Sequence, residues 1–228
     1  MFDHTSTSRR HLARSNLLRV SSVATRLVLI VVFVAVQAAL ARAAHAEERR
    51  NSGGTFTDSR DGKTYKTVVI ADRIWMAENL SYDAAKGSYC YDDDVKNCST
   101  YGRLYTFEAA RRAVPQGWHL PSKDEFERLL AELGGPGPAY AKLVDGGSSQ
   151  FNVLFAGSHN ASGGPQSPEG FYAGLGLDTS FWSSSGNSLL GDFFTGEANQ
   201  LTVSRIRQEA RIYGSLRSYG FSIRCVKD

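Results

Sequence analysis

The clearest pattern in the chain runs from Gly117 to Gly135, where apolar and polar positions first alternate and then take the spacing of a helix. Ser122 and Glu125 form a capping box, in which each side chain satisfies a backbone N–H left free at a helix start. Four apolar residues follow and give the helix one buried face: Phe126, Leu129, Leu130 and Leu133. The pattern predicts a short strand, a turn and a helix that ends at the paired glycines 134 and 135.

Two segments upstream follow the same two spacings. Alternation along residues 65–69, a turn at 71–72 and a return along 74–76 predict a hairpin. Residues 106–114 have helical spacing and predict a second helix, which Thr106 begins.

The spacing is less regular after residue 135. The Gly-Pro-Gly-Pro run at 135–138 and the Gly/Ser-rich run at 160–168 predict turns and loops. Residues 151–155 alternate as a strand, strands return from Leu201 onward, and residues 220–228 predict a final strand. The two faces of this final strand are Phe221, Ile223 and Cys225, and Ser222, Arg224 and Val226.

The N-terminal 46 residues have the composition of an export signal, and we expect residues 1–46 to be a signal peptide. A basic stretch precedes an apolar run at 27–41, and small residues at 44–46 suit cleavage. The run is shorter than the roughly 20 residues of a membrane span, which favours a cleaved signal. An uncleaved membrane anchor is the alternative. Residues 47–55 predict a flexible tether. Export predicts a secreted protein or one of the periplasm or cell envelope.

Removal of the signal changes the charge of the protein. The chain is formally +3, but residues 1–46 hold six arginines and one aspartate, which leaves about −2 on the remainder. A nucleic-acid binder carries a basic surface on its folded domain, so we expect no nucleic-acid partner. Residues 56–228 are long enough for one domain with a substantial core, and we expect a single domain there.

The segment from Cys90 to Cys98 suggests two kinds of site. In an exported protein, two cysteines this close predict a local disulfide. The acidic triplet at 92–94 invites a calcium site, but Ca²⁺ takes six to eight oxygens and three adjacent carboxylates cannot all converge on it. A solvated acidic turn is the preferred hypothesis, and we expect no metal and no cofactor.

The sequence has no recognisable catalytic constellation. After residue 46 the histidines are His119 and His159, and neither has the neighbours of a nucleophile or a general base. His119 lies in the central motif, where a hydrogen-bonded structural role is favoured. The spacing of potential ligands does not match a zinc site.

Five blocks carry a resemblance: 61–65 with 75–80, 90–98 with 100–105, Gly-Trp-His-Leu-Pro-Ser at 117–122, Phe-Trp-Ser-Ser at 181–184, and 220–228. They resemble the Fibrobacter succinogenes major paralogous domain, a family of exported bacterial proteins of unknown function. More distantly, residues 119–126 are similar to a run in C-type-lectin-like domains and formylglycine-generating enzymes, although the paired active-site cysteines of the latter are missing. The resemblance implies an α+β, C-type-lectin-like fold, with two helices packed on irregular antiparallel sheets with long loops.

The chain departs from the family at one cysteine. Members carry a fourth cysteine just before the Pro-x-Gly-Trp block, where this chain has Val114. The resemblance therefore implies that Cys225 is unpaired. Because a disulfide needs Cβ atoms about 3.5–4.5 Å apart, it also implies that Val114 and Cys225 are packed neighbours.

These observations favour an exported, non-catalytic binding module with a glycan or a protein at the cell surface as its partner. Weak candidates for binding residues are Asp92, Asp94, Trp182 and Ser183, because aromatic faces beside a few polar groups suit such surfaces. Trp182 in a concavity would favour ligand binding, whereas a buried Trp182 would favour the alternative of a purely structural envelope protein. An envelope enzyme, such as a hydrolase, is the other alternative. The C-terminal arginines form either a patch for an anionic partner or a solvated face: Arg205, Arg207, Arg211, Arg217 and Arg224.

Overall fold

The computed structural model describes residues 28–30, 32–40, 53–160, 170–186 and 196–228. The chain divides into two compact units, Met1–Arg50 and Asn51–Asp228. In the first unit, residues 28–30 and 32–40 are helical and exposed. No helix in the described ranges is long and apolar enough to cross a membrane. The expected cleavage site at 44–46 lies outside these ranges.

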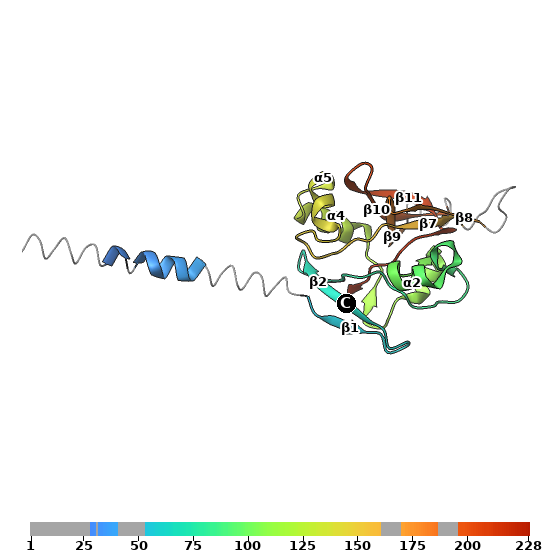
Figure 1. Ribbon diagram of the computed structural model, residues 1–228, viewed down its shortest axis with the longest axis horizontal. Coiled ribbons are helices and arrows are strands. Elements are labelled where there is room, and N and C mark those ends of the chain that lie inside the picture. The colour runs from blue at the N-terminus through green and yellow to red at the C-terminus, as the bar shows by residue number, and fades with distance from the viewer. Residues whose placement is uncertain (1–27, 31, 41–52, 161–169, 187–195) are drawn as a thin grey trace, which may run out of the picture. The chain divides into compact units, whose positions relative to one another are not determined.

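The described part of the second unit is a mixed α+β domain whose strands form three sheets (Figure 1). The first sheet has the order β1 (Thr55–Thr57), β2 (Thr64–Ile70), β3 (Arg73–Met76), β13 (Val226–Lys227) and β6 (Trp118–His119). The second has the order β11 (Glu209–Leu216), β10 (Glu197–Ser204), β9 (Asp178–Gly186), β7 (Ala156–Asn160) and β12 (Tyr219–Gly220), and β8 (Phe171–Leu175) also pairs with β7. The third joins β4 (Ser88–Tyr89) to β5 (Leu104–Tyr105). Named strands pair antiparallel, except that β7 and β9 are parallel.

The helices are η1 (Tyr91–Asp93), α2 (Val95–Tyr101), α3 (Phe107–Ala113), α4 (Lys123–Glu132) and α5 (Pro136–Leu143). Helices α4 and α5 contact each other and pack on β11, and Figure 1 shows them together on one side of this sheet. Helix α3 packs against β5 and β9. The predicted number of helices, two, was therefore too low, because α2 and α5 are present in addition to the expected α3 and α4.

The predicted hairpin and both predicted helices are confirmed. Ala71 and Asp72 have φ of 51° and 57°, which closes β2 and β3 with the backbone twist of a tight hairpin. Glu125 N–H donates to Ser122 Oγ at 3.2 Å, and Ser122 N–H donates to Glu125 Oε2 at 2.9 Å, so the capping box begins α4 as expected. At α3 the Thr106 side chain accepts a hydrogen bond from the Ala109 backbone N–H, without the reciprocal bond of a capping box.

The expectation of a turn at 135–138 was wrong. Gly135 has a φ of 92° and lies just before α5, and Pro136 occupies the first helical position. Proline is tolerated there because its missing N–H would have no partner within the helix. Glycine and proline therefore mark the start of a helix, whose buried residues Ala139 and Leu143 pack into the core.

The prediction of a strand at 151–155 was also wrong. Phe151, Val153 and Phe155 are all buried, so the alternation is correct. However, Asn152 has a left-handed backbone with a φ of 51°, and Val153 makes only an isolated bridge to Val144. Burial at every second position here reflects an extended loop laid over the core, and β7 begins only at Ala156.

The end of the expected tether at 47–55 belongs to the folded domain. Thr55 begins β1, and Gly54 accepts a hydrogen bond from the Thr67 backbone N–H at 2.9 Å. The rest of the tether, up to residue 52, lies outside the described residues.

Two hydrophobic clusters form most of the core, one on each side of β3. Trp75 faces the cluster under α4 and α5, and the next residue, Met76, faces the cluster of α3, since successive side chains of a strand point to opposite faces. Cys225 belongs to the second cluster, and Val114 packs against the same cluster. Direct contact between Val114 and Cys225 remains a prediction.

Candidate functional site

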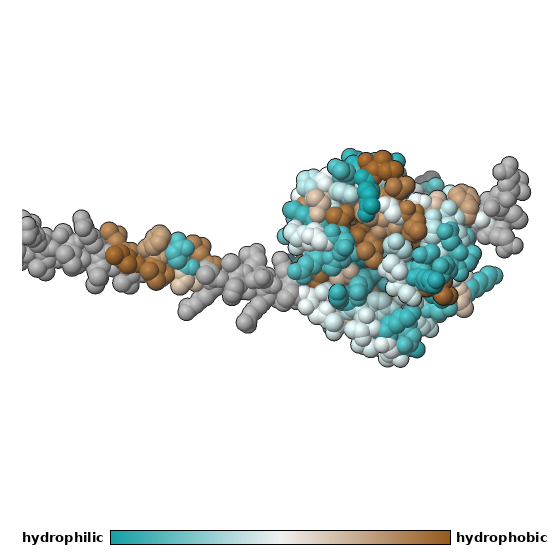
Figure 2. Space-filling model, in the orientation of Figure 1, coloured by the Kyte–Doolittle hydropathy of each residue, from teal (hydrophilic) through white to brown (hydrophobic). Residues whose placement is uncertain are grey.

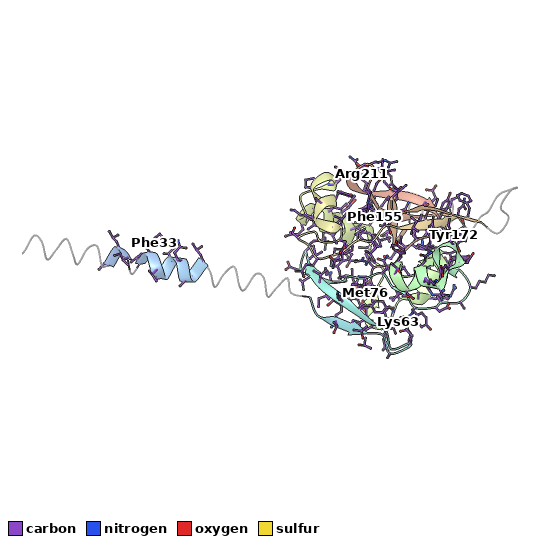
Figure 3. All side chains as sticks on the ribbon, in the orientation of Figure 1. Phe33, Lys63, Met76, Phe155, Tyr172 and Arg211 are labelled. Atoms are coloured by element: carbon purple, nitrogen blue, oxygen red, sulfur yellow. A yellow bond between two sulfur atoms is a disulfide. The ribbon has the colours of Figure 1, made fainter. Side chains whose placement is uncertain are left out.

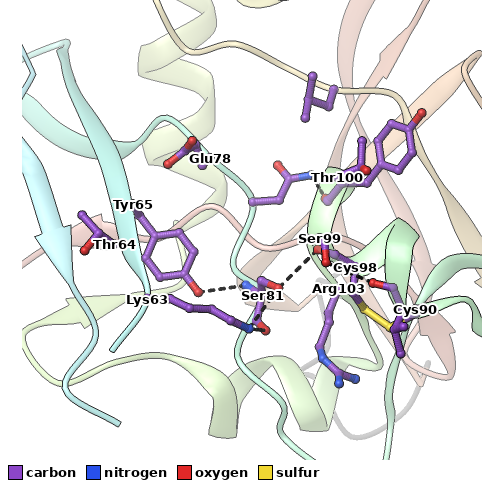
Figure 4. A pocket seen from close by; sticks show the side chains of 15 residues that line it. Lys63, Thr64, Tyr65, Glu78, Ser81, Cys90, Cys98, Ser99, Thr100 and Arg103 are labelled. Carbon is purple, nitrogen blue, oxygen red and sulfur yellow. Dashed lines mark hydrogen bonds between the residues drawn. A yellow bond between two sulfur atoms is a disulfide. The ribbon is translucent and has the colours of Figure 1, made fainter. Parts of the chain in front are cut away.

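A cleft of about 550 Å³ lies beside the Cys90–Cys98 disulfide (Figure 4). Its lining consists of residues 63–65, Glu78, Asn79, Ser81, Cys90, Val95, residues 98–103 and Leu154. Parts of these stretches belong to the blocks that carry the family resemblance. The motifs thus converge on one concave surface, which their spacing along the sequence does not indicate.

The disulfide fixes one wall of the cleft. Cys90 and Cys98 form the predicted bridge, with an S–S distance of 2.04 Å and a Cα–Cα distance of 4.9 Å. Cys98 lies in α2, and Asp94 caps this helix by accepting a hydrogen bond from the Lys96 backbone N–H at 2.9 Å. A helix this short is marginal alone, so the bridge and the cap hold it in place. The disulfide is typical of a protein outside the cytoplasm.

Tyr65 brings a buried hydroxyl group to the cleft, across from the disulfide (Figure 4). Its oxygen accepts a hydrogen bond from Ser81 N–H at 3.1 Å, and Lys63 Nζ donates to the Ser81 carbonyl at 2.6 Å. Burial raises the pKa of Tyr65 to about 12, so the hydroxyl keeps its hydrogen at neutral pH. This hydrogen has no acceptor within the described residues and can be donated to a ligand.

Helix α2 contributes hydroxyl groups to the cleft. Ser99 and Thr100 are exposed and donate to the carbonyls of Val95 and Lys96, four residues earlier in the chain. Their oxygens keep lone pairs that can accept hydrogen bonds from a ligand. The cleft therefore offers both donors and acceptors.

The charged residues of the cleft are largely engaged by the protein itself. Arg103 donates to Ser88 Oγ at 3.1 Å and to Asp83 Oδ2 at 2.6 Å. Glu78 accepts a hydrogen bond from the Lys66 backbone N–H at 2.7 Å. These contacts hold the walls, and they leave neutral hydroxyl groups as the main polar features that a ligand can meet.

Asn79 lines the cleft and also holds a buried arginine. Arg224 Nε donates to Asn79 Oδ1 at 2.7 Å, and its other nitrogens donate to the carbonyls of Phe151 and Asn152. Burial lowers the pKa of Arg224 to about 9, so the guanidinium is charged at neutral pH. Arg224 is fully buried and belongs neither to a solvated face nor to a surface patch, which corrects the expectation for this arginine.

The structure buries two of the four candidate binding residues. Trp182 and Ser183 are both 0% exposed. Trp182 Nε1 donates to the Tyr105 carbonyl at 2.7 Å, and its ring packs on Phe107 and Phe221. A side chain in this position supports the core and presents no face to a ligand.

The other two candidates are exposed but not brought together as a site. Asp94 is the cap of α2, and Asp92 has a left-handed backbone with a φ of 53°. Between them, Asp93 accepts a hydrogen bond from the Tyr172 hydroxyl at 2.6 Å. Within the described ranges, no group of three or more His, Cys, Asp or Glu residues is arranged to hold a metal ion.

His119 contacts a carboxylate at each of its ring nitrogens. Its Nδ1 lies 2.7 Å from Asp228 Oδ1, and its Nε2 lies 3.0 Å from Glu125 Oε1. Both ring nitrogens are thus taken by carboxylates, and Ser122 Oγ bonds Glu125 rather than the histidine. This geometry joins β6, the start of α4 and Asp228, and it leaves no ring nitrogen to act on a substrate.

His159 and Cys225 are both buried. His159 lies between the rings of Tyr89 and Tyr172, at centroid distances of 4.2 and 4.4 Å. Cys225 is a free thiol, and burial raises its pKa well above the usual range. A buried, protonated thiol is inert as a nucleophile.

The comparisons with known proteins place most of the second unit in one family. No curated protein and no solved structure matches the chain. A family model described as the Fibrobacter succinogenes major domain matches residues 68–227, which include most of the cleft lining and most of both core clusters. The chain therefore belongs to the Fibrobacter succinogenes major domain family.

Proposed function

We propose that this protein is an exported, non-catalytic module that binds a glycan in the cleft beside the Cys90–Cys98 disulfide. The observation that carries the proposal is the lining of this cleft, in which the Tyr65 hydroxyl has a donor to spare and Ser99 has an acceptor to spare. Sugars present several hydroxyl groups that donate and accept in turn. A cleft of about 550 Å³ is within the usual range for small-ligand sites.

The rigid walls support the same proposal. The disulfide, the Asp94 cap and the Arg103–Asp83 ion pair hold the lining without a ligand. Prearranged polar groups lose little entropy on binding, which favours affinity for a flexible sugar. A C-type-lectin-like fold and export by the segment at 1–46 are parts of this proposal, and the disulfide is compatible with both.

The contacts of His119 favour the binding module over the envelope hydrolase. A general base needs a ring nitrogen that reaches the substrate. In the described residues, both nitrogens of His119 face carboxylates of the protein itself. The burial of Trp182 favours the alternative of a purely structural envelope protein, whereas the hydroxyl groups that line the cleft favour a binding module.

A variant that fills the cleft tests the proposal. Ser99 is exposed on α2 and lines the cleft, so Ser99→Trp should occupy the space for a ligand with little effect on folding. Lys96 is exposed on the same helix outside the lining, and Lys96→Trp is the matched control. The purified protein and both variants would be applied to an array of neutral and acidic oligosaccharides, and their melting temperatures compared.

We expect the protein and the Lys96→Trp variant to bind the same oligosaccharides, and the Ser99→Trp variant to lose that binding at an unchanged melting temperature. Absence of binding to every oligosaccharide, or equal binding by the Ser99→Trp variant, would refute the proposal. Capture of a protein partner that Ser99→Trp also blocks would assign the cleft to a protein ligand instead.

A further inference from the structure

A second pocket of about 400 Å³ adjoins the cleft. Tyr101 and Leu154 line both, so the two concavities meet at these residues. Figure 2 shows apolar surface in the region of the domain where Figure 3 labels Phe155, another residue of this second pocket. The two pockets therefore share these residues as a wall, and a ligand of more than one sugar can contact both.

Arg205 brings a guanidinium without an ion-pair partner among the described residues to the second pocket. Its guanidinium lies over the ring of Phe155, with 4.4 Å from Cζ to the ring centroid. Among the described residues, no hydrogen bond or ion pair engages the guanidinium, although its backbone N–H donates to the Leu177 carbonyl. Asp145 lines the same pocket, and within the described ranges its carboxylate forms no ion pair with Arg205.

The stacking prepares Arg205 to bind an anion. The contact of the guanidinium with the Phe155 ring restricts the side chain. The N–H groups at its edge remain in the plane that matches the two oxygens of a carboxylate. The exposed carboxylate of Asp145 can accept hydrogen bonds from sugar hydroxyls in the same pocket.

We propose that the ligand is an acidic oligosaccharide, which spans both pockets and places a carboxylate of a uronic acid on Arg205. This proposal rests on the proposed function, because it names the class of glycan that the cleft would take. The cleft beside the disulfide binds hydroxyl groups in one part of the oligosaccharide. The second pocket binds the uronic acid in another part of the same oligosaccharide.

Two matched pairs test the proposal. The ligands are the uronic-acid oligosaccharide bound most tightly on the array and its methyl ester, which keeps the sugar and removes the charge. The variants are Arg205→Gln and Arg207→Gln, which remove the same charge from one hairpin. Arg207 is exposed outside both pockets, where it donates to the Tyr213 hydroxyl at 3.3 Å.

We expect Arg205→Gln to weaken binding of the acid about tenfold, the size of one charge-assisted hydrogen bond, and Arg207→Gln to leave it unchanged. The methyl ester should bind the unmodified protein about as weakly as the acid binds Arg205→Gln. The Arg205→Gln variant should bind the acid and its methyl ester with equal affinity. Arg205→Lys keeps the charge but lacks the planar guanidinium. Its affinity for the acid should lie between that of the unmodified protein and that of Arg205→Gln.

Equal affinity of the protein for acid and ester, or an equal loss in both glutamine variants, would overturn the proposal. In that case neutral glycans that still bind, and that Ser99→Trp still blocks, would leave the proposed function intact. Absence of any glycan binding would instead refute the proposed function itself.

Discussion

Arg224 shows how one residue can join distant parts of the chain. It is fully buried and donates to Asn79 and to the carbonyls of Phe151 and Asn152, which lie more than 70 residues away in sequence. A buried charge is tolerated only when hydrogen bonds replace the water it loses. Because the partners are backbone carbonyls of an extended loop, no local pattern could predict this burial.

The first prediction concerns this arginine. Arg224→Met fills a similar volume but leaves Asn79 Oδ1 and the loop carbonyls without donors. We expect the free energy of unfolding to fall by about 3–5 kcal/mol, measured by urea denaturation. Arg211→Met, at an exposed arginine paired with Glu209, is the control and should cause no measurable change. Equal effects of the two substitutions would contradict the role of Arg224.

The second prediction concerns stability at acid pH. Burial works to raise the pKa of Glu125, but hydrogen bonds from the Ser122 N–H and from His119 outweigh it, so the pKa lies below its ordinary value of 4.5. The hydrogen-bonded Arg60 side chain likewise lowers the pKa of Asp58. A carboxylate with a lowered pKa in the folded state stabilises the protein above the unfolded pKa. This stability is lost as the pH falls through the folded value.

We therefore expect stability to fall as the pH drops below about 4.5. Glu125→Gln should lower stability at pH 7 and make the acid decline shallower, while the contribution of Asp58 remains. Glu127→Gln, on the exposed side of α4, is the control. Thermal unfolding between pH 3 and pH 7 measures both effects, and an unchanged slope in Glu125→Gln would argue against the assigned contacts.

Helices and strands with local sequence signals were predictable, and those that depend on packing between distant segments were not. Helix α4 was predictable because Ser122 and Glu125 satisfy backbone groups within one turn. The β2–β3 hairpin was predictable because alternation and the 71–72 turn agree. Helix α5 was missed because Gly and Pro at 135–138 are typical of turns, and its helical state depends on packing against α4 and β11.

The disulfide prediction belongs to the scale of elements. The Cys90→Ala/Cys98→Ala double variant should lower the free energy of unfolding by about 2–3 kcal/mol, the loop-closure entropy of so short a bridge. It should also weaken oligosaccharide binding, because α2 is a wall of the cleft. Reduction of the unmodified protein is the matched control and should produce the same two changes. An unchanged affinity after reduction would separate α2 from the site.

At the scale of the whole domain, the candidate site depends on convergence that sequence spacing does not reveal. Tyr65 comes from β2, Asn79 follows β3, Ser99 comes from α2, and Leu154 precedes β7. The family blocks pointed to some of these residues without indicating that they share one cleft. The aromatic residue singled out from the sequence, Trp182, instead lies in the core that supports them.

The most direct measurement of the central claim is a map of the bound surface in solution. The purified protein would be titrated with the tightest-binding oligosaccharide of the array while the backbone amide resonances are followed by NMR. We expect the largest shifts at 99–103 and at Leu154, where the two pockets meet. Shifts confined to the surroundings of His119, or to β11 away from both pockets, would contradict the assignment of the site.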